Sequence, residues 1–307
     1  MTAAPVTEPL KGLPAARAFA ADIKLSHSIF ALPFALLAAT LAAMSNEAVW
    51  GETWGVASFV LILVCMVAAR TVAMAANRML DAQLDTLNPR TARRAIPAGQ
   101  LARGWVALTA SLFATAFVLA CAGFWWIYGN VWPLALSVPV LAFLCGYPLL
   151  KRFTSLCHYY LGAALALSPI CAWIAMTGGV AIEPFLMAGG VLCWTAGFDV
   201  IYATADHDSD VRHGVHSLPS RLGIGRALWA SRGTHVVGVG FLLALGVISP
   251  LLGAIWFAAV GVVAALLVVE HRLVRPDDLS KVSLAFFTVN GVISTLLGTA
   301  GIVDALI

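Results

Sequence analysis

Charged residues are scarce in this 307-residue chain, because only 11% of its positions are Asp, Glu, Lys or Arg. Soluble globular domains carry roughly 25% charged residues and about 45–50% apolar residues, whereas the hydrophobic share here is 61%. The net charge of +3 comes without a basic patch of the kind that binds nucleic acid. We therefore expect an integral membrane protein, with the lipid bilayer as a partner and no nucleic acid.

The sequence also contains no CxxC pair, and we expect no removable leader. The six cysteines form no CxxC motif and have no cluster of histidines at metal spacing, so we expect free thiols. His213 and His216 form an HxxH pair without a third ligand nearby, which does not favour zinc. Residues 1–24 have no apolar core followed by a small-residue cleavage site, so we expect the first apolar run to remain as an anchor.

Long apolar runs make up most of the sequence. Nine stretches have about the 20 residues that a helix needs to cross a bilayer, and they lie near residues 26–45, 54–76, 105–125, 131–150, 158–177, 184–204, 229–250, 253–271 and 283–303. We expect an all-α polytopic membrane protein with nine transmembrane helices. The whole chain, residues 1–307, is expected to form one membrane domain with a cytoplasmic N-terminal segment of about residues 1–24.

The basic residues avoid one side of this expected topology. If the chain changes side at each span, all 18 Lys and Arg lie in or beside the N-terminus and segments 77–104, 151–157, 205–228 and 272–282. The opposite segments carry only acidic charges, at Glu47, Glu52, Glu183 and Asp304. Because cytoplasmic loops are enriched in Lys and Arg, we expect a bacterial inner membrane protein whose N-terminus and basic loops face the cytoplasm.

Two polar segments on the basic side repeat each other. NRMLDAQLD begins at residue 77, and FDVIYATADHDSDVRHGVHSLPSRLG spans residues 198–223. Asp81 and Asp85 match Asp206 and Asp210 at an offset of 125 residues, four expected spans apart, so both pairs face the same compartment. This spacing predicts two parallel four-helix repeats followed by a ninth helix.

The spacing within each repeat favours a metal-bound diphosphate. Carboxylates one helical turn apart repel each other unless a cation lies between them, and Mg²⁺ binds through one or two carboxylates plus substrate phosphates. We predict that Asp81, Asp85, Asp206 and Asp210 hold Mg²⁺. The neighbouring cations that could take phosphate oxygens are Arg78, Arg93, Arg94, Lys151, Arg152 and Arg212. A diphosphate at a membrane edge implies a lipid tail among the helices.

Two ionisable residues, Arg70 and Asp199, lie inside apolar sequence, where such groups usually mark a site. Eleven residues at about 100° each return to nearly the same helix face, which places Arg70 with Asn77 and Asp81. Arg70 and Asp199 are candidates to pair with each other. Alternatively, Arg70 contacts an aromatic carboxylate and Asp199 a phenol or a cation.

The chain resembles the UbiA family of intramembrane aromatic prenyltransferases. The family pattern NDxxDxxxD is present as NRMLDAQLD, with Arg78 where many members have Asp, and YxxxDxxxD begins at Tyr202. Further resemblance lies in IKLSHSIFALPFALL (23–37), PRTARRAIPAG (89–99) and YPLLKR (147–152). By this resemblance Asn77 supports the first aspartate pair. Lys151 and Arg152 are candidates to stabilise the departing diphosphate, and Tyr147, one turn before Lys151, is a candidate to line the aromatic site.

The resemblance implies Mg²⁺-dependent transfer of a polyprenyl group from polyprenyl diphosphate to a small aromatic acid in respiratory quinone biosynthesis. Acceptors of the 4-hydroxybenzoate type and of the 1,4-dihydroxy-6-naphthoate type both fit the motifs. A family enzyme with a non-quinone acceptor remains an alternative. A membrane transporter is another, since internal repeats and buried charges are also found there, although the carboxylates here gather at one membrane face.

The charge asymmetry predicts the result of cysteine-accessibility labelling. Positions near 90 and 215 should be labelled only from the cytoplasm, and positions near 50 and 180 only from outside, because basic loops stay on the cytoplasmic side. Labelling of position 90 from the outside would contradict the predicted orientation.

Overall fold

The computed structural model describes residues 8–24, 30–45 and 55–307, and within these ranges the protein is helical and contains no β-strand. The α-helices are α1 (Gly12–Asp22), α2 (Leu32–Met44), α4 (Gly55–Leu87), α5 (Arg103–Tyr128), α6 (Trp132–Leu150), α7 (Cys157–Thr177), α8 (Ile182–Ala203), α9 (His207–His213), α10 (Leu218–Leu222), α11 (Ile224–Ile248), α12 (Ala254–Leu273), α13 (Val282–Leu284) and α14 (Asn290–Leu306). A 3₁₀ turn at Thr204–Asp206 and a π turn at Ala285–Val289 interrupt this series.

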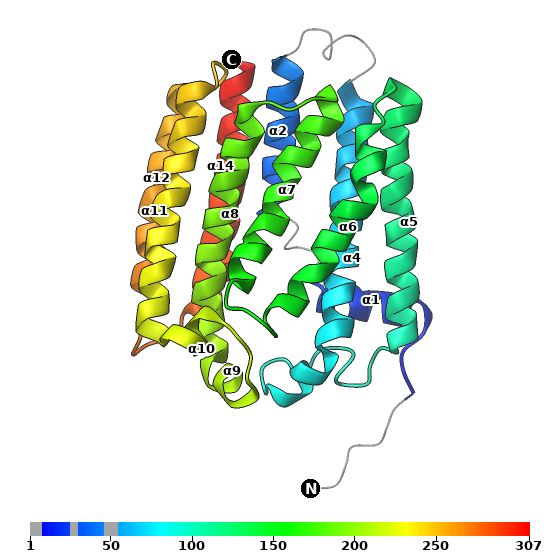
Figure 1. Ribbon diagram of the computed structural model, residues 1–307, viewed down its shortest axis with the longest axis vertical. Helices are drawn as coiled ribbons and strands as arrows, with labels where there is room; N and C mark the ends of the chain where they lie inside the picture. The colour runs from blue at the N-terminus through cyan, green and yellow to red at the C-terminus, as the bar shows by residue number, and fades with distance from the viewer. Residues whose placement is uncertain (1–7, 25–29, 46–54) are drawn as a thin grey trace, which may run out of the picture.

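The long helices stand side by side as a bundle, and α1 lies across one end of it (Figure 1). α2 and α7 pack against each other inside the bundle, and α14 closes it by packing between α2 and α12. α4 packs extensively on α5 in the first half of the chain, and α8 packs on α11 in the same way in the second half. α9 and α10 lie at the same end as α1, whereas α14 ends at the opposite end (Figure 1).

Eight helices among the described residues are long and apolar enough to cross a membrane. The expected number was nine, and the first expected span corresponds to α2, a shorter apolar helix of 13 residues. The start of that span and the loop carrying Glu47 and Glu52 lie outside the described residues. Large apolar side chains cover outer helix faces, as expected of a protein in lipid, and include Leu108, Leu112, Trp229, Val236 and Val247.

The two motif segments differ in local structure. The first motif belongs to one uninterrupted helix, α4, so the prediction of a single face for Arg70, Asn77 and Asp81 is confirmed. The second does not continue as one α-helix, because α8 ends at Ala203 and the 3₁₀ turn intervenes before α9. At this turn the Thr204 hydroxyl donates to the Ile201 carbonyl (2.6 Å), a side-chain bond of the kind that bends helices.

A glycine lets α7 and α8 approach closely at the level of the site. A β-carbon on Gly162 would lie 2.4 Å from the Leu192 carbonyl oxygen, so any larger residue would force the two backbones apart. The close approach brings His158, near the start of α7, within hydrogen-bond distance of Asp199 on α8.

Candidate active site

A polar cavity of about 520 Å³ opens at the bundle end that carries α1 and α9. Most of the residues that the sequence analysis singled out line this cavity. They are Arg70, Asn77, Arg78, Asp81, Asp85, Arg93, Arg94, Tyr147, Lys151, Asp199, Tyr202, Asp206 and Asp210. Two predicted phosphate-binding residues are not among its lining. Arg212 is exposed and donates to the Asp208 carbonyl, and Arg152 donates to the Leu80 carbonyl.

Both carboxylates of the first motif are buried and paired with cations from other elements. Asp81 accepts from the Lys151 ammonium at the end of α6 (2.6 Å), and its second oxygen, Oδ1, is buried, accepts no hydrogen bond and lies 4.0 Å from Arg152 Nη2. Asp85 accepts both of its hydrogen bonds from Arg94 Nη1 (2.7 and 2.8 Å). Pairing with a cation offsets the cost of burying these two charges.

The loop between α4 and α5 connects the two motifs. Asn88 and Arg90 both donate to Asp206 Oδ1 in the second motif, at 2.8 and 2.7 Å, while Arg94 of the same loop holds Asp85 in the first. A second donor of Arg90, Nη1, bonds the Tyr202 hydroxyl (2.6 Å). Asp85 and Asp206, which belong to different motifs, are therefore held around one cavity by a single loop.

Arg78 holds α1 against this cavity. Its guanidinium donates to the carboxylate (2.8 Å) and to the backbone carbonyl (2.7 Å) of Asp22, the last residue of α1. A third donor bonds Asn77 Oδ1 (3.0 Å), and the other Asp22 carboxylate oxygen accepts from the Ala95 N–H (3.1 Å). These bonds commit three of the five guanidinium donors to protein partners.

Arg70 and Asp199 both line the cavity but do not contact each other, so the alternative in which they form a pair is wrong. Asp199 Oδ2 contacts His158 Nδ1 (2.7 Å), and the Leu218 N–H donates to His158 Nε2 (3.1 Å). Because Nε2 accepts that bond, the proton lies on Nδ1 and is donated to Asp199. Arg70 donates to the Lys24 carbonyl (3.3 Å), and its buried Nε has no partner.

Lys24 is a site residue that the sequence analysis did not name. It lines the cavity, and its ammonium lies 4.2 Å from the centre of the Phe287 ring. Burial lowers the pKa of Lys24, and the nearby Arg90 and Arg78 lower it further. Arg90 and His158 were missed as well. His158 begins an apolar span, so the rule that flagged Arg70 would have found it, whereas nothing local distinguishes Arg90 from Arg93.

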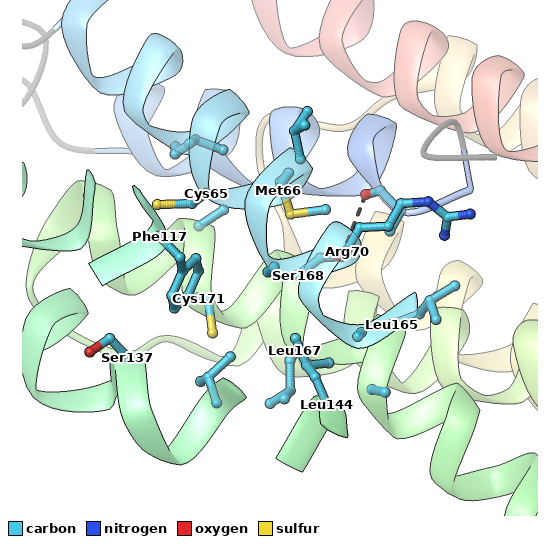
Figure 2. Close-up of a pocket in the computed structure, with 18 of the residues that line it drawn as sticks. Cys65, Met66, Arg70, Phe117, Ser137, Leu144, Leu165, Leu167, Ser168 and Cys171 are labelled. Atoms are coloured by element: carbon cyan, nitrogen blue, oxygen red, sulfur yellow. Dashed lines mark hydrogen bonds between the residues drawn. The ribbon is translucent and has the colours of Figure 1, made fainter. Parts of the chain in front are cut away.

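An apolar cavity of about 190 Å³ adjoins the polar one, between α4, α5, α6 and α7. Its deeper lining includes Cys65, Phe117 and Cys171, and Figure 2 shows the Arg70 guanidinium directed away from these side chains. The six residues that line both cavities mark the junction, and they are Phe30, Arg70, Met74, Tyr147, Leu161 and Leu165. The site therefore joins a charged compartment to a hydrophobic one.

The carboxylates suit a hard cation that also binds a ligand. Within the described ranges no three His, Cys, Asp or Glu side chains are grouped so that they could hold a metal ion by themselves. Two aspartates one turn apart, with an Asp81 Oδ1 that accepts no hydrogen bond, fit Mg²⁺, which takes oxygen ligands and completes its shell with water and phosphate.

Comparisons with known proteins agree with this architecture. A sequence model of the UbiA prenyltransferase family matches residues 31–292. The chain is 30% identical over 250 residues to a protein of Tolumonas auensis named 4-hydroxybenzoate octaprenyltransferase. The matched region covers 80% of this chain and 84% of the relative.

Two solved structures share the fold. A UbiA homologue from Aeropyrum pernix K1 superposes with a TM-score of 0.79 at 30% identity, covering 91% of this chain and 98% of that one. A UbiA homologue from Archaeoglobus fulgidus, whose structure contains DMAPP and Mg²⁺, has a TM-score of 0.69 at 15% identity and covers 94% of this chain and 99% of that one.

The Arg78–Asp22 pair predicts a stability effect that a double variant can isolate. Arg78→Met should lower the free energy of unfolding by about 3–5 kcal/mol, because it leaves the Asp22 carboxylate, whose side chain is only 11% exposed, without its cation. The double variant Asp22→Asn/Arg78→Met should regain much of this loss. Thermal unfolding of purified protein measures both.

Lys11→Met is the matched control, since Lys11 and its partner Glu8 are both exposed, and it should unfold at the wild-type temperature. Equal unfolding temperatures for Arg78→Met and Lys11→Met would show that the buried pair contributes nothing.

Proposed function

The chain belongs to the UbiA prenyltransferase family, and we propose that it transfers a polyprenyl group from polyprenyl diphosphate to a small aromatic acid in respiratory quinone biosynthesis. The proposed acceptor is of the 4-hydroxybenzoate type, after the name of the Tolumonas auensis relative, or of the 1,4-dihydroxy-6-naphthoate type. We place the site on the cytoplasmic face of a bacterial inner membrane, where the basic loops are expected.

One observation carries the proposal: a charged cavity and an apolar cavity meet at Arg70 and Tyr147. A prenyl diphosphate has the same division, with a charged head and a hydrocarbon tail. Seven Lys or Arg side chains and six Asp side chains line the charged cavity, which suits a diphosphate bound together with a divalent cation. The tail would lie between α4, α5, α6 and α7.

The aspartate pairs and their cations would act on the leaving group. Mg²⁺ held by Asp81, Asp85, Asp206 and Asp210 would supply positive charge to the diphosphate oxygens. Lys151 and Arg94, which bond motif aspartates at 2.6 and 2.7 Å, are close enough to turn to the phosphates. As the allylic C–O bond breaks, its electron pair leaves with the diphosphate, and these charges stabilise it.

The aromatic acid would lie at the junction of the two cavities. The buried, unpartnered Nε of Arg70 is a donor that a carboxylate would satisfy, and Tyr147 lines the same junction. Asp199, oriented by His158, would accept a hydrogen bond from the phenol and so raise the electron density of the ring. The carbon ortho to the hydroxyl supplies the electron pair of the new C–C bond, and its proton passes to the diphosphate.

A direct assay tests the function. Purified protein is incubated with Mg²⁺, a labelled polyprenyl diphosphate and a panel that contains 4-hydroxybenzoate, 1,4-dihydroxy-6-naphthoate and non-carboxylated phenols. We expect a prenylated aromatic acid that is lost on chelation of the metal. Transfer only to a non-carboxylated acceptor would rule out the proposed substrate class.

Changing a motif aspartate should abolish the transfer. Asp81→Asn or Asp206→Asn removes a carboxylate charge while nearly preserving shape, so activity should fall by about a hundredfold or more while protein yield stays similar. Asp208→Asn is the matched control, because Asp208 lies between the aspartates of the second motif and is exposed. Normal transfer by Asp81→Asn at matched expression would remove Asp81 from the site.

Arg70→Leu should act mainly on the aromatic acid. Loss of a charge-assisted hydrogen bond should raise KM for the acid by about ten- to a hundredfold and leave KM for the prenyl diphosphate nearly unchanged. Initial rates with both substrates varied give the two constants. Arg272→Leu, an exposed change near the end of α12, is the control. An unchanged KM for the acid in Arg70→Leu would exclude the carboxylate contact.

A further inference from the structure

A π turn at Ala285–Val289 precedes α14 and carries two aromatic residues of the cavity, Phe286 and Phe287. A π turn holds one residue more than an α turn, is rare, and occurs frequently at functional sites. Such a turn persists only where surrounding bonds stabilise it. Here a buried group of three polar side chains supplies these bonds.

Asn290 is the centre of that group and is fully buried. Its side-chain amide donates to the Ala285 carbonyl at the start of the π turn (3.2 Å) and to Glu270 Oε1 on α12 (2.7 Å). Its amide oxygen accepts from Trp194 Nε1 on α8 (2.7 Å). One side chain therefore ties the π turn to two other helices and uses every donor that it has.

The π turn places Phe286 within an aromatic group at the cavity. The centre of its ring lies 4.1 Å from that of Tyr202, 5.2 Å from Phe198 and 5.8 Å from Phe30. The Tyr202 hydroxyl accepts from Arg90, which holds Asp206. The aromatic group, defined as Phe30, Phe198, Tyr202 and Phe286, thus borders both the second motif and the junction of the two cavities.

We propose that Asn290, held by Glu270 and Trp194, is a positioning residue that keeps Phe286 in the aromatic group and thereby protects the prenyl cation from water. This inference rests on the proposed prenyl transfer. Ring faces attract a cation and exclude water. When the allylic C–O bond has broken, the cation has two fates: the aromatic acid supplies the electron pair for a C–C bond, or water supplies it for a C–O bond and loses a proton to diphosphate.

The ratio of free prenol to prenylated acid measures these two fates and does not depend on how much protein is folded. In Asn290→Leu and Phe286→Leu, water should reach the cation more often, so this ratio should rise by about two- to thirtyfold. Glu270→Gln retains the acceptor oxygen for Asn290 and should keep the wild-type ratio, whereas Glu270→Leu removes that oxygen and should raise the ratio.

Trp256→Phe is the matched control, because it deletes a buried hydrogen bond, from Trp256 Nε1 to the Leu242 carbonyl (3.0 Å), away from the cavity. It should lower the unfolding temperature without changing the ratio. If Asn290→Leu does not fold, Glu270→Leu provides the same test. An unchanged ratio in Phe286→Leu, or a rise in Trp256→Phe equal to that in Glu270→Leu, would overturn the inference. Absence of transfer by the wild-type protein would instead refute the proposed function.

Discussion

The charged end of the bundle depends on pairs between motif aspartates and cations that come from distant parts of the chain. Asp81 is bound by Lys151 from the end of α6, and Asp206 by Arg90 from the loop after α4. Removing Lys151 would leave the charge of Asp81, which is 1% exposed, without its cation, at a cost of several kcal/mol. The bundle end that carries the motifs is therefore assembled by charge pairing between elements, in contrast to the apolar packing that holds the helices together elsewhere.

In the proposed reaction the same cations and aspartates would also bind the substrate, because an anionic diphosphate can pair with the cations and Mg²⁺ with the aspartates. Lys151 and Arg94 neutralise motif aspartates in this structure, and in the proposed reaction a diphosphate with Mg²⁺ would offer each of these groups a new partner. Such an exchange of partners would keep every charge paired, so binding would cost less free energy than burying an unpaired charge. Arg78 differs from these cations, because three of its donors are used on Asp22 and Asn77. At this position, where many family members have Asp, the arginine serves to hold α1.

Sequence reasoning succeeded where the physical rule was local. Repeated spacing predicted that Asp81, Asp85, Asp206 and Asp210 would line one cavity, and helical periodicity placed Arg70 on the face of α4 that carries Asp81. It failed where the partner was remote. One alternative paired Asp199 with Arg70, but the close contact of α7 with α8 at Gly162 brings His158 to Asp199 instead. No pattern in the sequence indicates which buried charge will meet which donor.

By itself the sequence determined that the chain is an all-helical membrane protein, because stretches of apolar residues this long can satisfy their backbone in lipid only as helices. It also determined which end of the bundle would carry the charged residues, since the polar segments could not cross. Only the tertiary structure decided how those residues are used. Hydrogen bonds act over about 3 Å, so Asn290 could be linked to Trp194, and Arg90 to Tyr202, only after helices far apart in the sequence had packed together.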